Sequence, residues 1–273
     1  MSLSPVLPPR PCPNEAGGNA EMLMWISPDR IFYAGLLGKP GMRAMGSLMI
    51  YVATQGRIRI AVGGGDWQVC DLAVVHPYEP HQLLSEAPLI NLIKIEAETL
   101  DIAALPALLA TSGAVDAPWF VERVRRGHRE FGVAGGMREL GAADFDRFFF
   151  DEPLPQRRLD RRIESVVEMI KRNPAAASDA ESCAEAAHLS FSRFLHLFKQ
   201  EVGVPFRTFR TWKRARGVLR HVKYSGTLAS VALDSGYPDS THFSHCIKSV
   251  YGLQPRQIFA GSRRLVVHAT DLQ

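Results

Sequence analysis

The sequence is poor in cysteine and has no long apolar run. Its four cysteines include no Cys-x-x-Cys pair, so neither a disulfide framework nor a four-thiolate zinc site is indicated. No apolar stretch reaches the roughly 18 residues that a transmembrane helix needs. The first residues also lack the charged-then-apolar order of a secretory signal. We therefore expect a cytoplasmic protein without membrane contact, with a flexible Pro- and Gly-rich arm at residues 1–20.

A second absence bears on metal binding. Metal-binding barrels of the cupin type usually carry a His-x-His motif followed by further ligands, and no His-x-His occurs in this chain. His242 and His245 stand three residues apart, whereas two-histidine zinc sites on helices more often use positions i and i+4 and always need further ligands. The sequence therefore predicts no metal, no other cofactor and no enzyme activity.

The charge is unevenly divided along the chain. Residues 1–156 hold 13 Lys and Arg against 18 Asp and Glu, a net charge of −5, whereas residues 157–273 hold 19 against 10, a net charge of +9. This asymmetry indicates an anionic partner for the C-terminal part, with double-stranded DNA as the leading candidate. A basic surface that is simply solvated and binds no partner would give the same net charge.

Short β-branched stretches occupy the region from Gly46 to Glu96. SLMIYVAT, RIRIAV, DWQVCDLAVV and LINLIKIE are separated by turn signals about every ten residues, which favours an antiparallel barrel or sandwich. Three segments with helical periodicity follow at residues 101–113, 117–132 and 142–150. The Phe-rich third segment needs cover from the barrel or from a second subunit.

Polar and aromatic residues near the expected barrel mouth suggest an organic ligand pocket. The candidates are Trp67, Tyr78, His81 and Gln82, of which His81 ends the turn sequence HPYEPH. A barrel filled by its own side chains is the alternative.

The C-terminal half begins after a Pro-containing linker at residues 151–158. Apolar residues recur at helical spacing from Leu159 to Ile170, and a capping box from Ser178 to Glu181 opens the next helix. Ser190 caps another helix almost immediately. Two short helices joined by a turn of three or four residues predict a helix-turn-helix unit.

This unit occurs twice. A displacement of 49 residues places Phe194 on Phe243, His196 on His245 and Gly203 on Gly252. Thr227 is the expected cap of the second copy's first helix, and Gly236 its left-handed stop. Residues 205–222 predict one long helix between the copies, with an apolar face inward and Arg207, Arg210, Lys213, Arg214 and Arg220 mostly outward.

The pattern resembles the DNA-binding region of the AraC/XylS family of bacterial transcription regulators. The resemblance rests on AEAAHLSFSRFLHLFKQEVGVPF, the basic helix, and ASVALDSGYPDSTHFSHCIKSVYGLQP, and covers about Leu159 to Phe259. It implies an α+β chain with a cupin-like β-barrel for sensing and dimerisation at residues 21–150. A double helix-turn-helix domain follows at residues 159–260, and residues 261–273 form a tail.

The resemblance also implies that the first half of each second helix reads bases. Carried onto this sequence, the base-contacting residues are Ser192, Arg193, Leu195, His196, Ser240, Thr241, Ser244 and His245. Basic side chains and helix N-termini are expected on phosphates, which names Ser190, Lys199, Arg207, Lys213, Arg214, Asp239 and Lys248. The two second helices should enter successive major-groove segments about one helical turn apart.

Three hypotheses remain open at this point. The first is a transcription regulator, acting as an activator or a repressor, that binds DNA, contacts RNA polymerase, forms a homodimer and responds to a small-molecule effector. The second is a cupin-like metal-dependent enzyme fused to a DNA-binding anchor. In the third, the barrel is an interaction module without a small ligand.

Overall fold

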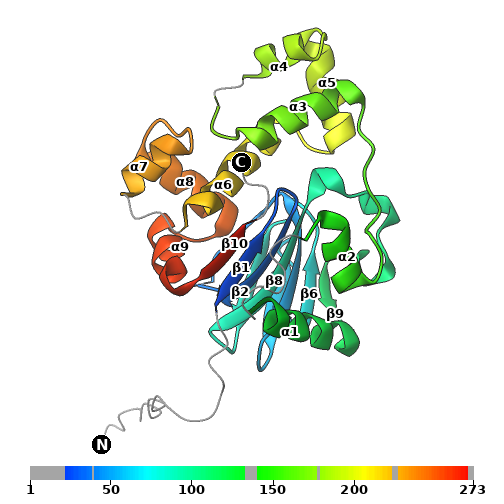
Figure 1. Cartoon of the computed structure of the whole chain (residues 1–273), viewed down its shortest axis with the longest axis vertical. Helices are drawn as coiled ribbons and strands as arrows, with labels where there is room; N and C mark the ends of the chain where they lie inside the picture. Colours follow the sequence, from blue (N-terminus) through cyan, green and yellow to red (C-terminus); the bar gives the residue numbers. More distant parts are fainter. Residues whose placement is uncertain (1–21, 39, 133–139, 177–178, 223–226, 270–273) are drawn as a thin grey trace, which may run out of the picture.

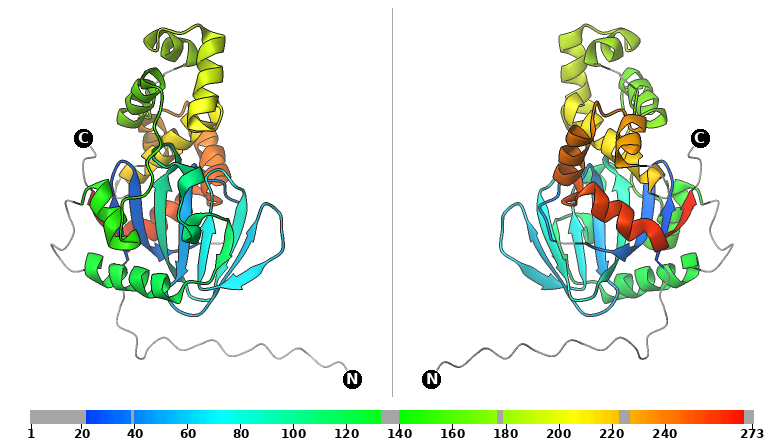
Figure 2. Two further views of the ribbon diagram at one scale, coloured as in Figure 1. Left: turned by 90° about the vertical axis from the view of Figure 1, so that its right-hand side faces the viewer. Right: turned by 90° about the vertical axis from the view of Figure 1, so that its left-hand side faces the viewer.

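The N-terminal half folds into two β-sheets that pack against each other (Figures 1 and 2). The structure is a computed structural model and describes residues 22–38, 40–132, 140–176, 179–222 and 227–269. The strands of the larger sheet, in spatial order, are β10 Val266–Ala269, β1 Leu23–Ile26, β2 Arg30–Leu36, β8 Leu89–Glu96, β3 Ser47–Ala53, β6 Leu72–Val75 and β9 Gly113–Val115. The smaller sheet has the order β5 Gln68–Cys70, β4 Ile58–Val62 and β7 His81–Ser85.

The predicted barrel is an open arrangement of two sheets. All strand pairs are antiparallel except β1 with β10. The α+β class, with a sheet-rich N-terminal part and a helical C-terminal part, is confirmed. Of the strands, β1, β2, β7, β9 and β10 were not predicted from the sequence.

The central strand β8 is covered on both faces. Successive side chains of a strand point to opposite faces of its sheet. Ile90 and Leu92 accordingly lie in the core between the two sheets, whereas Ile93 and Ile95 lie in a second core on the outer face. Burial on both sides explains why LINLIKIE is a nearly continuous apolar run.

Two helices cover the outer face of the larger sheet. They are α1, Pro118–Gly132, and α2, Ala142–Phe150, both close to the predicted bounds. Phe145 stacks on Trp25 at a centroid distance of 4.9 Å, and Phe149 on Phe32 at 5.5 Å. The apolar face of α2 is therefore buried within its own subunit.

The helix predicted at residues 101–113 does not form. The structure has two 3-10 turns, Ile102–Ala104 and Ala107–Leu109, followed by β9. Pro106 explains the difference, because it lacks an amide hydrogen and pushes the preceding Leu105 out of the helical region, to φ −61° and ψ 144°.

The C-terminal half is helical up to residue 264. Its elements are α3 Arg161–Arg172, α4 Ala180–Ala186, α5 Phe191–Val202, α6 Phe206–Gly217, a 3-10 turn at Val218–His221, α7 Leu228–Asp234, α8 Ser240–Tyr251, α9 Pro255–Gly261 and a 3-10 turn at Ser262–Arg264. The N-cap of α4 is Asp179, which accepts a hydrogen bond from the Ser182 amide, and the Ser178 proposed for that role lies outside the described residues.

The two helix-turn-helix units have different core environments. The first unit, α4 with α5, shares its own core with α3 and the start of α6. The second unit, α7 with α8, belongs to the same core as the two sheets, in which Phe243 and Ile247 join Tyr51 and Ile60. The halves of the chain therefore share one continuous core on the side of the second unit.

The linker at residues 151–158 is held in place. Leu154 is buried, and Gln156 forms a β-bridge with Leu100. Arg157 donates from Nε to the Leu100 carbonyl and from Nη1 to the Glu201 carbonyl near the end of α5, at 3.2 and 2.8 Å. This segment thus fixes the first unit to the N-terminal half.

Residues 266–269 were assigned to a tail by the sequence analysis but form a strand of the N-terminal sheet. Figure 1 shows β10 beside β1, with α9 close by. The pairing is parallel over four residues, from Leu23 with Val266 to Ile26 with Ala269. None of the described helices is long and apolar enough to cross a membrane.

Candidate functional site

The second helix of each unit begins and ends in a corresponding way. Ser190 is the N-cap of α5 and Asp239 that of α8, and the left-handed residues Gly203 and Gly252 close the two helices at φ 87° and 68°. The caps differ in strength. Asp239 accepts hydrogen bonds from the Thr241 and His242 amides at 2.7 and 2.8 Å, whereas the Ser190 side chain makes no cap bond.

The inner faces of α5 and α8 are equivalent, which confirms the repeat. Phe194 and Phe198 of α5 are fully buried, as are their counterparts Phe243 and Ile247 of α8. The turn of the second unit is one residue longer, because residues 187–190 join α4 to α5 whereas residues 235–239 join α7 to α8. Gly236 takes the predicted left-handed conformation, and His188 takes it in the first unit.

The outer faces carry the residues expected to contact bases. Exposed side chains are Ser192, Arg193, His196, Ser240, Thr241 and His245, and those of Leu195 and Ser244 are partly exposed. The N-terminal half does not cover either set. Both helices thus present a short, polar, solvent-facing surface at their N-terminal ends.

His242 has a different role from His245. Its Nδ1 lies 2.8 Å from Asp239 Oδ2, so it completes the cap of α8. Within the described ranges, no group of three or more His, Cys, Asp or Glu residues could hold a metal ion. Cys246 is half-buried and accepts a hydrogen bond from the Tyr237 hydroxyl at 3.2 Å.

The basic residues proposed for phosphate contacts divide into two groups. Lys199, Arg207 and Lys248 are exposed, and the partly exposed Arg214 lies 5.6 Å from the ring centre of Tyr237. The placement of Lys213 on the outer face is wrong, because only 2% of this residue is exposed. Arg210, also expected outside, is buried and donates to the Pro174 and Ala176 carbonyls.

Lys213 belongs to a buried ion cluster between the two halves. It donates to Glu96, the last residue of β8, and to Glu98 in the 3-10 turn Ala97–Thr99 that follows. Arg216 Nε and Trp212 Nε1 each lie 2.8 Å from a Glu96 carboxylate oxygen. Burial opposes ionisation of Glu96, but Lys213 and Arg216 outweigh burial and hold its pKa below the ordinary value. This cluster fixes α6 to the larger sheet.

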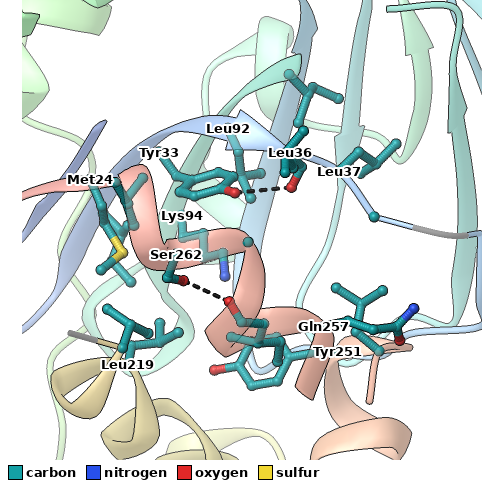
Figure 3. A pocket seen from close by; sticks show the side chains of 18 of the residues that line it. Met24, Tyr33, Leu36, Leu37, Leu92, Lys94, Leu219, Tyr251, Gln257 and Ser262 are labelled. Atoms are coloured by element: carbon teal, nitrogen blue, oxygen red, sulfur yellow. Dashed lines mark hydrogen bonds between the residues drawn. The ribbon is translucent and has the colours of Figure 1, made fainter. Parts of the chain in front are cut away.

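A cavity of about 170 Å³ lies beside this cluster, between the N-terminal sheet and the second unit (Figure 3). The sheet side contributes Met24, Tyr33 and Leu92, the helical side contributes Leu219 and Tyr251, and Leu265 lies directly before β10. The walls are mostly apolar. No sequence pattern indicates this cavity, because its lining residues are distributed over both halves of the chain.

Two cations face this apolar space. Lys94 of β8 is buried and points into the cavity, with Nζ 5.1 Å from the ring centre of Tyr251 (Figure 3). Arg43 is also buried, and its Nε and Nη2 have no hydrogen-bond partner. No carboxylate among the described residues forms an ion pair with either. Burial lowers the pKa of Lys94 to about 7.

The four residues predicted to line a ligand pocket do not line this cavity. Trp67 is exposed beside Arg59, at 6.0 Å, and Gln82 lies on β7 of the smaller sheet. The Tyr78 hydroxyl is buried near the ion cluster. The His81 ring is bonded on both sides, by Nε2 to the Tyr51 hydroxyl at 2.7 Å and by Nδ1 to the Glu79 carbonyl at 2.9 Å. Of the four, only His81 has a clear structural role here, because its two hydrogen bonds hold the start of β7 in place.

Comparisons with known proteins agree with this geometry. Residues 183–261 match a family described as a helix-turn-helix domain. An uncharacterized HTH-type transcriptional regulator of Haemophilus influenzae is 29% identical over 99 residues, which make up 36% of this chain and 33% of that protein. The chain therefore matches about a third of the length of this curated relative.

Two solved structures of ToxT from Vibrio cholerae share the fold across both halves. An apo variant has a TM-score of 0.57 at 11% identity, covering 85% of this chain and 97% of that one. Wild-type ToxT with a bound unsaturated fatty acid has a TM-score of 0.53 at 10% identity, covering 90% and 98%. The domain match over residues 183–261, the duplicated units and the shared fold agree with the resemblance to the AraC/XylS family found in the sequence.

Proposed function

We propose that this chain is a ligand-responsive transcription regulator that binds double-stranded DNA with α5 and α8. The observation that carries the proposal is the duplication of the helix-turn-helix unit with equivalent exposed faces. A helix of this kind fits the major groove, where base edges can be distinguished. A metal-dependent enzyme is not supported, because His81 uses both ring nitrogens within the protein.

The proposed base contacts are those of the exposed N-terminal ends of the two helices. They are Ser192, Arg193, Leu195 and His196 in the first unit, and Ser240, Thr241, Ser244 and His245 in the second. Ser190, Lys199, Arg207, Arg214, Asp239 and Lys248 are proposed to lie at phosphates, by side-chain charge or through helix N-termini. Lys213 is removed from that set because Glu96 and Glu98 bind it.

The DNA-binding proposal is tested by in vitro selection from a randomised duplex pool, followed by competition gel shifts. We expect the enriched duplex to compete at least about 1,000-fold better than random duplex at physiological salt. Equal competition by the two duplexes would show that binding is only electrostatic and would contradict a sequence-specific regulator.

For the effector we propose an organic anion with an apolar body, such as a long-chain fatty acid. Burying a cation without a counter-ion costs desolvation free energy. A ligand carboxylate between Lys94 and Arg43 would offset this free energy by pairing with both cations. The apolar cavity walls would hold the hydrocarbon chain. The related fold of ToxT, which was crystallised with an unsaturated fatty acid, supports this choice.

The proposed ligand would act on the arrangement of the two halves. Its site takes walls from β1, β2 and β8 on one side and from α8 and α9 on the other. A ligand that touches both sides binds the packed arrangement more tightly than a separated one and shifts the population toward it. The same arrangement also contains the Glu96 ion cluster.

Thermal shift measurements test the ligand class. A monounsaturated long-chain fatty acid should raise the melting temperature, whereas its uncharged methyl ester should not, because only the acid offers a carboxylate. Lys94→Met should abolish the shift. Arg59→Met is the matched control, since Arg59 is exposed on the smaller sheet, and it should leave the shift intact. Equal shifts with acid and ester would contradict an anion site, and no shift with either would favour an interaction module.

Homodimerisation, contact with RNA polymerase and action in the cytoplasm remain part of the proposal. The Phe-rich face of α2 is occupied by its own sheet, so it is not available for a second subunit. Trp119 of α1 is 54% exposed and lies 5.3 Å from the Arg123 guanidinium, which makes α1 the more suitable dimer contact.

A further inference from the structure

The last described strand attaches the DNA-binding half to the N-terminal sheet. β10 follows the second helix-turn-helix unit after α9 and one 3-10 turn, so the unit and the strand are separated by few residues. The Val266 amide donates to the Met22 carbonyl at 2.8 Å, and the strand then pairs with β1 in parallel register up to Ala269. β1 and β10 lie near opposite ends of the described chain. Their pairing is therefore a long-range contact that joins the C-terminal half to the N-terminal sheet.

Side chains of this segment enter both cores. Leu265 is 2% exposed and lies in the core shared by the sheets and the second unit, and Val267 packs against the same core. Val266 packs against the outer core. The segment thus behaves as an integral strand, with alternate residues on opposite faces, and its detachment would uncover β1.

A second contact holds the same unit at the C-terminal end of α8. The Ala44 amide donates to the Val250 carbonyl at 3.2 Å. Gly252 lies so close to the loop at Gly41 and Met42 that an added Cβ would meet the carbonyl oxygens of these residues at 3.0 and 2.9 Å. The second unit is therefore fixed at the end of α8 and again at β10.

The first unit is attached by polar contacts. Lys171 of α3 pairs with Asp29 at 2.8 Å, and Arg157 donates to the Glu201 carbonyl. Its apolar core is separate from the core of the sheets. The two units therefore have unequal freedom, because only the second one would have to leave a shared apolar core in order to turn.

We infer that β10 is a clasp that keeps the second helix-turn-helix unit in one orientation and thereby restrains DNA binding. Simultaneous docking of α5 and α8 on a duplex requires one particular relative orientation, and a strand paired into another domain opposes any adjustment toward it. Binding to DNA then competes with strand pairing, so removal of the clasp strengthens binding. The inference rests on the proposed DNA-binding function and does not depend on the ligand.

The clasp also borders the cavity. Gly261, Ser262 and Leu265 belong to its lining, and Ser262 donates from its hydroxyl to the Ile258 carbonyl at 2.7 Å (Figure 3). A ligand in the cavity contacts the base of β10 and keeps the strand paired. The effector site and the clasp thus stabilise the same closed arrangement.

The test compares two shortened chains in the absence of ligand. One ends at Arg264 and lacks Leu265 and β10, and its matched control ends at Ala269 and keeps the whole strand. The probe is the duplex enriched by in vitro selection with the chain that ends at Arg264. Fluorescence anisotropy then gives the Kd of the full chain and of both shortened chains for this duplex.

We expect the Kd of the chain that ends at Arg264 to be about tenfold lower than that of the full chain, or lower still. This ratio is within the usual range of coupling between two sites. The chain that ends at Ala269 should bind like the full chain. If the chain that ends at Arg264 does not fold, Val266→Pro replaces it both in the selection of the duplex and in the binding measurement, because proline removes the amide that bonds to Met22.

Equal or weaker binding by the folded clasp variant would overturn the clasp while leaving the DNA-binding function in place. If none of the chains, including the full one, selects or binds any duplex, the proposed function is overturned, and the clasp is overturned with it. The two failures are therefore distinguishable.

Discussion

His245 and His242 lie one turn apart on α8 but have different surroundings. His242 is bonded to Asp239, whereas His245 is exposed, with no hydrogen bond or ion pair among the described residues. Its counterpart His196 is exposed at the same position of α5. A solvated imidazole at the N-terminal half of a recognition helix is free to bond a base edge.

His245→Ala should weaken binding to the selected duplex by about 1–3 kcal/mol and leave the melting temperature unchanged. The expected loss reflects a base contact, since His245 contributes nothing to the protein core. Ser249→Ala, at an exposed position near the end of α8, is the control and should change neither quantity. Unaltered affinity of the His245 variant in competition gel shifts would remove this residue from the base-reading set.

Lys213 and Lys248 are both basic residues of the C-terminal half, but only Lys248 is exposed. Lys213→Met should lower the free energy of unfolding by about 3–5 kcal/mol, because Glu96 and Glu98 would lose a buried partner. Lys248→Met should leave stability unchanged. It should reduce the slope of the logarithm of DNA affinity against the logarithm of salt concentration by about one unit.

Urea unfolding and a salt titration of Kd separate the two lysines. Equal stability of both variants would show that the Glu96 cluster does not stabilise the packing of α6 on the sheet. A salt slope that is unchanged by Lys248→Met would exclude Lys248 as a phosphate contact.

Lys94 should make ligand binding dependent on pH. Its pKa of about 7 results first from burial, with Arg43 and Arg216 lowering it further and Glu96 raising it. Tyr33 and Tyr251 also face the cavity, but burial keeps their pKa values far above this range. A bound carboxylate favours charged Lys94, so binding takes up a proton above pH 7.

The affinity for the fatty acid should therefore fall as pH rises from about 7 toward 9. Titration calorimetry in buffers of different ionisation enthalpy measures both the affinity and the proton uptake. Lys94→Met should bind weakly at every pH. A wild-type affinity that is constant over this range would show that Lys94 does not hold the ligand's charge.

Helices α5 and α8 end in the same left-handed glycine conformation but in different environments. Gly203 has only Arg157 nearby, at 3.5 Å from an added Cβ, whereas Gly252 faces backbone oxygens of Gly41 and Met42. Gly203→Ala should cost about 1–2 kcal/mol from backbone strain alone. Gly252→Ala should cost more, because the loop must also move. Equal losses on urea unfolding would show that the end of α8 is not tightly packed on this loop.

Local signals explain which elements were predictable. The capping residues Thr227 and Asp239, the stop at Gly236 and the period of buried residues in α3 all act within one or two turns of their own helix. The duplicated units were predictable for this reason, and so was the exposed face that carries His196 and His245.

Features that depend on distant contacts were not predictable. Lys213 looks like a surface residue in a basic helix, and only the packing of α6 on Glu96 and Glu98 buries it. VVHA at residues 266–269 is too short to indicate a strand without its partner β1. The cavity was also missed, because its cations Arg43 and Lys94 lie at least 125 positions (219 − 94) before its helical wall, which begins at Leu219.

On the scale of the whole molecule, the N-terminal sheet and the second helix-turn-helix unit form one body. The shared core, the Glu96 cluster, the cavity and β10 all lie on this interface. The first unit has its own core and is joined to that body by α6, the linker and ion pairs. We propose that a ligand in the cavity acts on the proposed DNA-binding surface by changing how firmly the second unit is held.

The central claim is that α5 and α8 bind the same duplex together. Hydroxyl-radical and methylation-interference footprints of the full chain on its selected duplex test this most directly. We expect two contacted major-groove segments on one face, with centres about 10 base pairs apart. A single contacted segment, or two segments on opposite faces of the duplex, would contradict the claim.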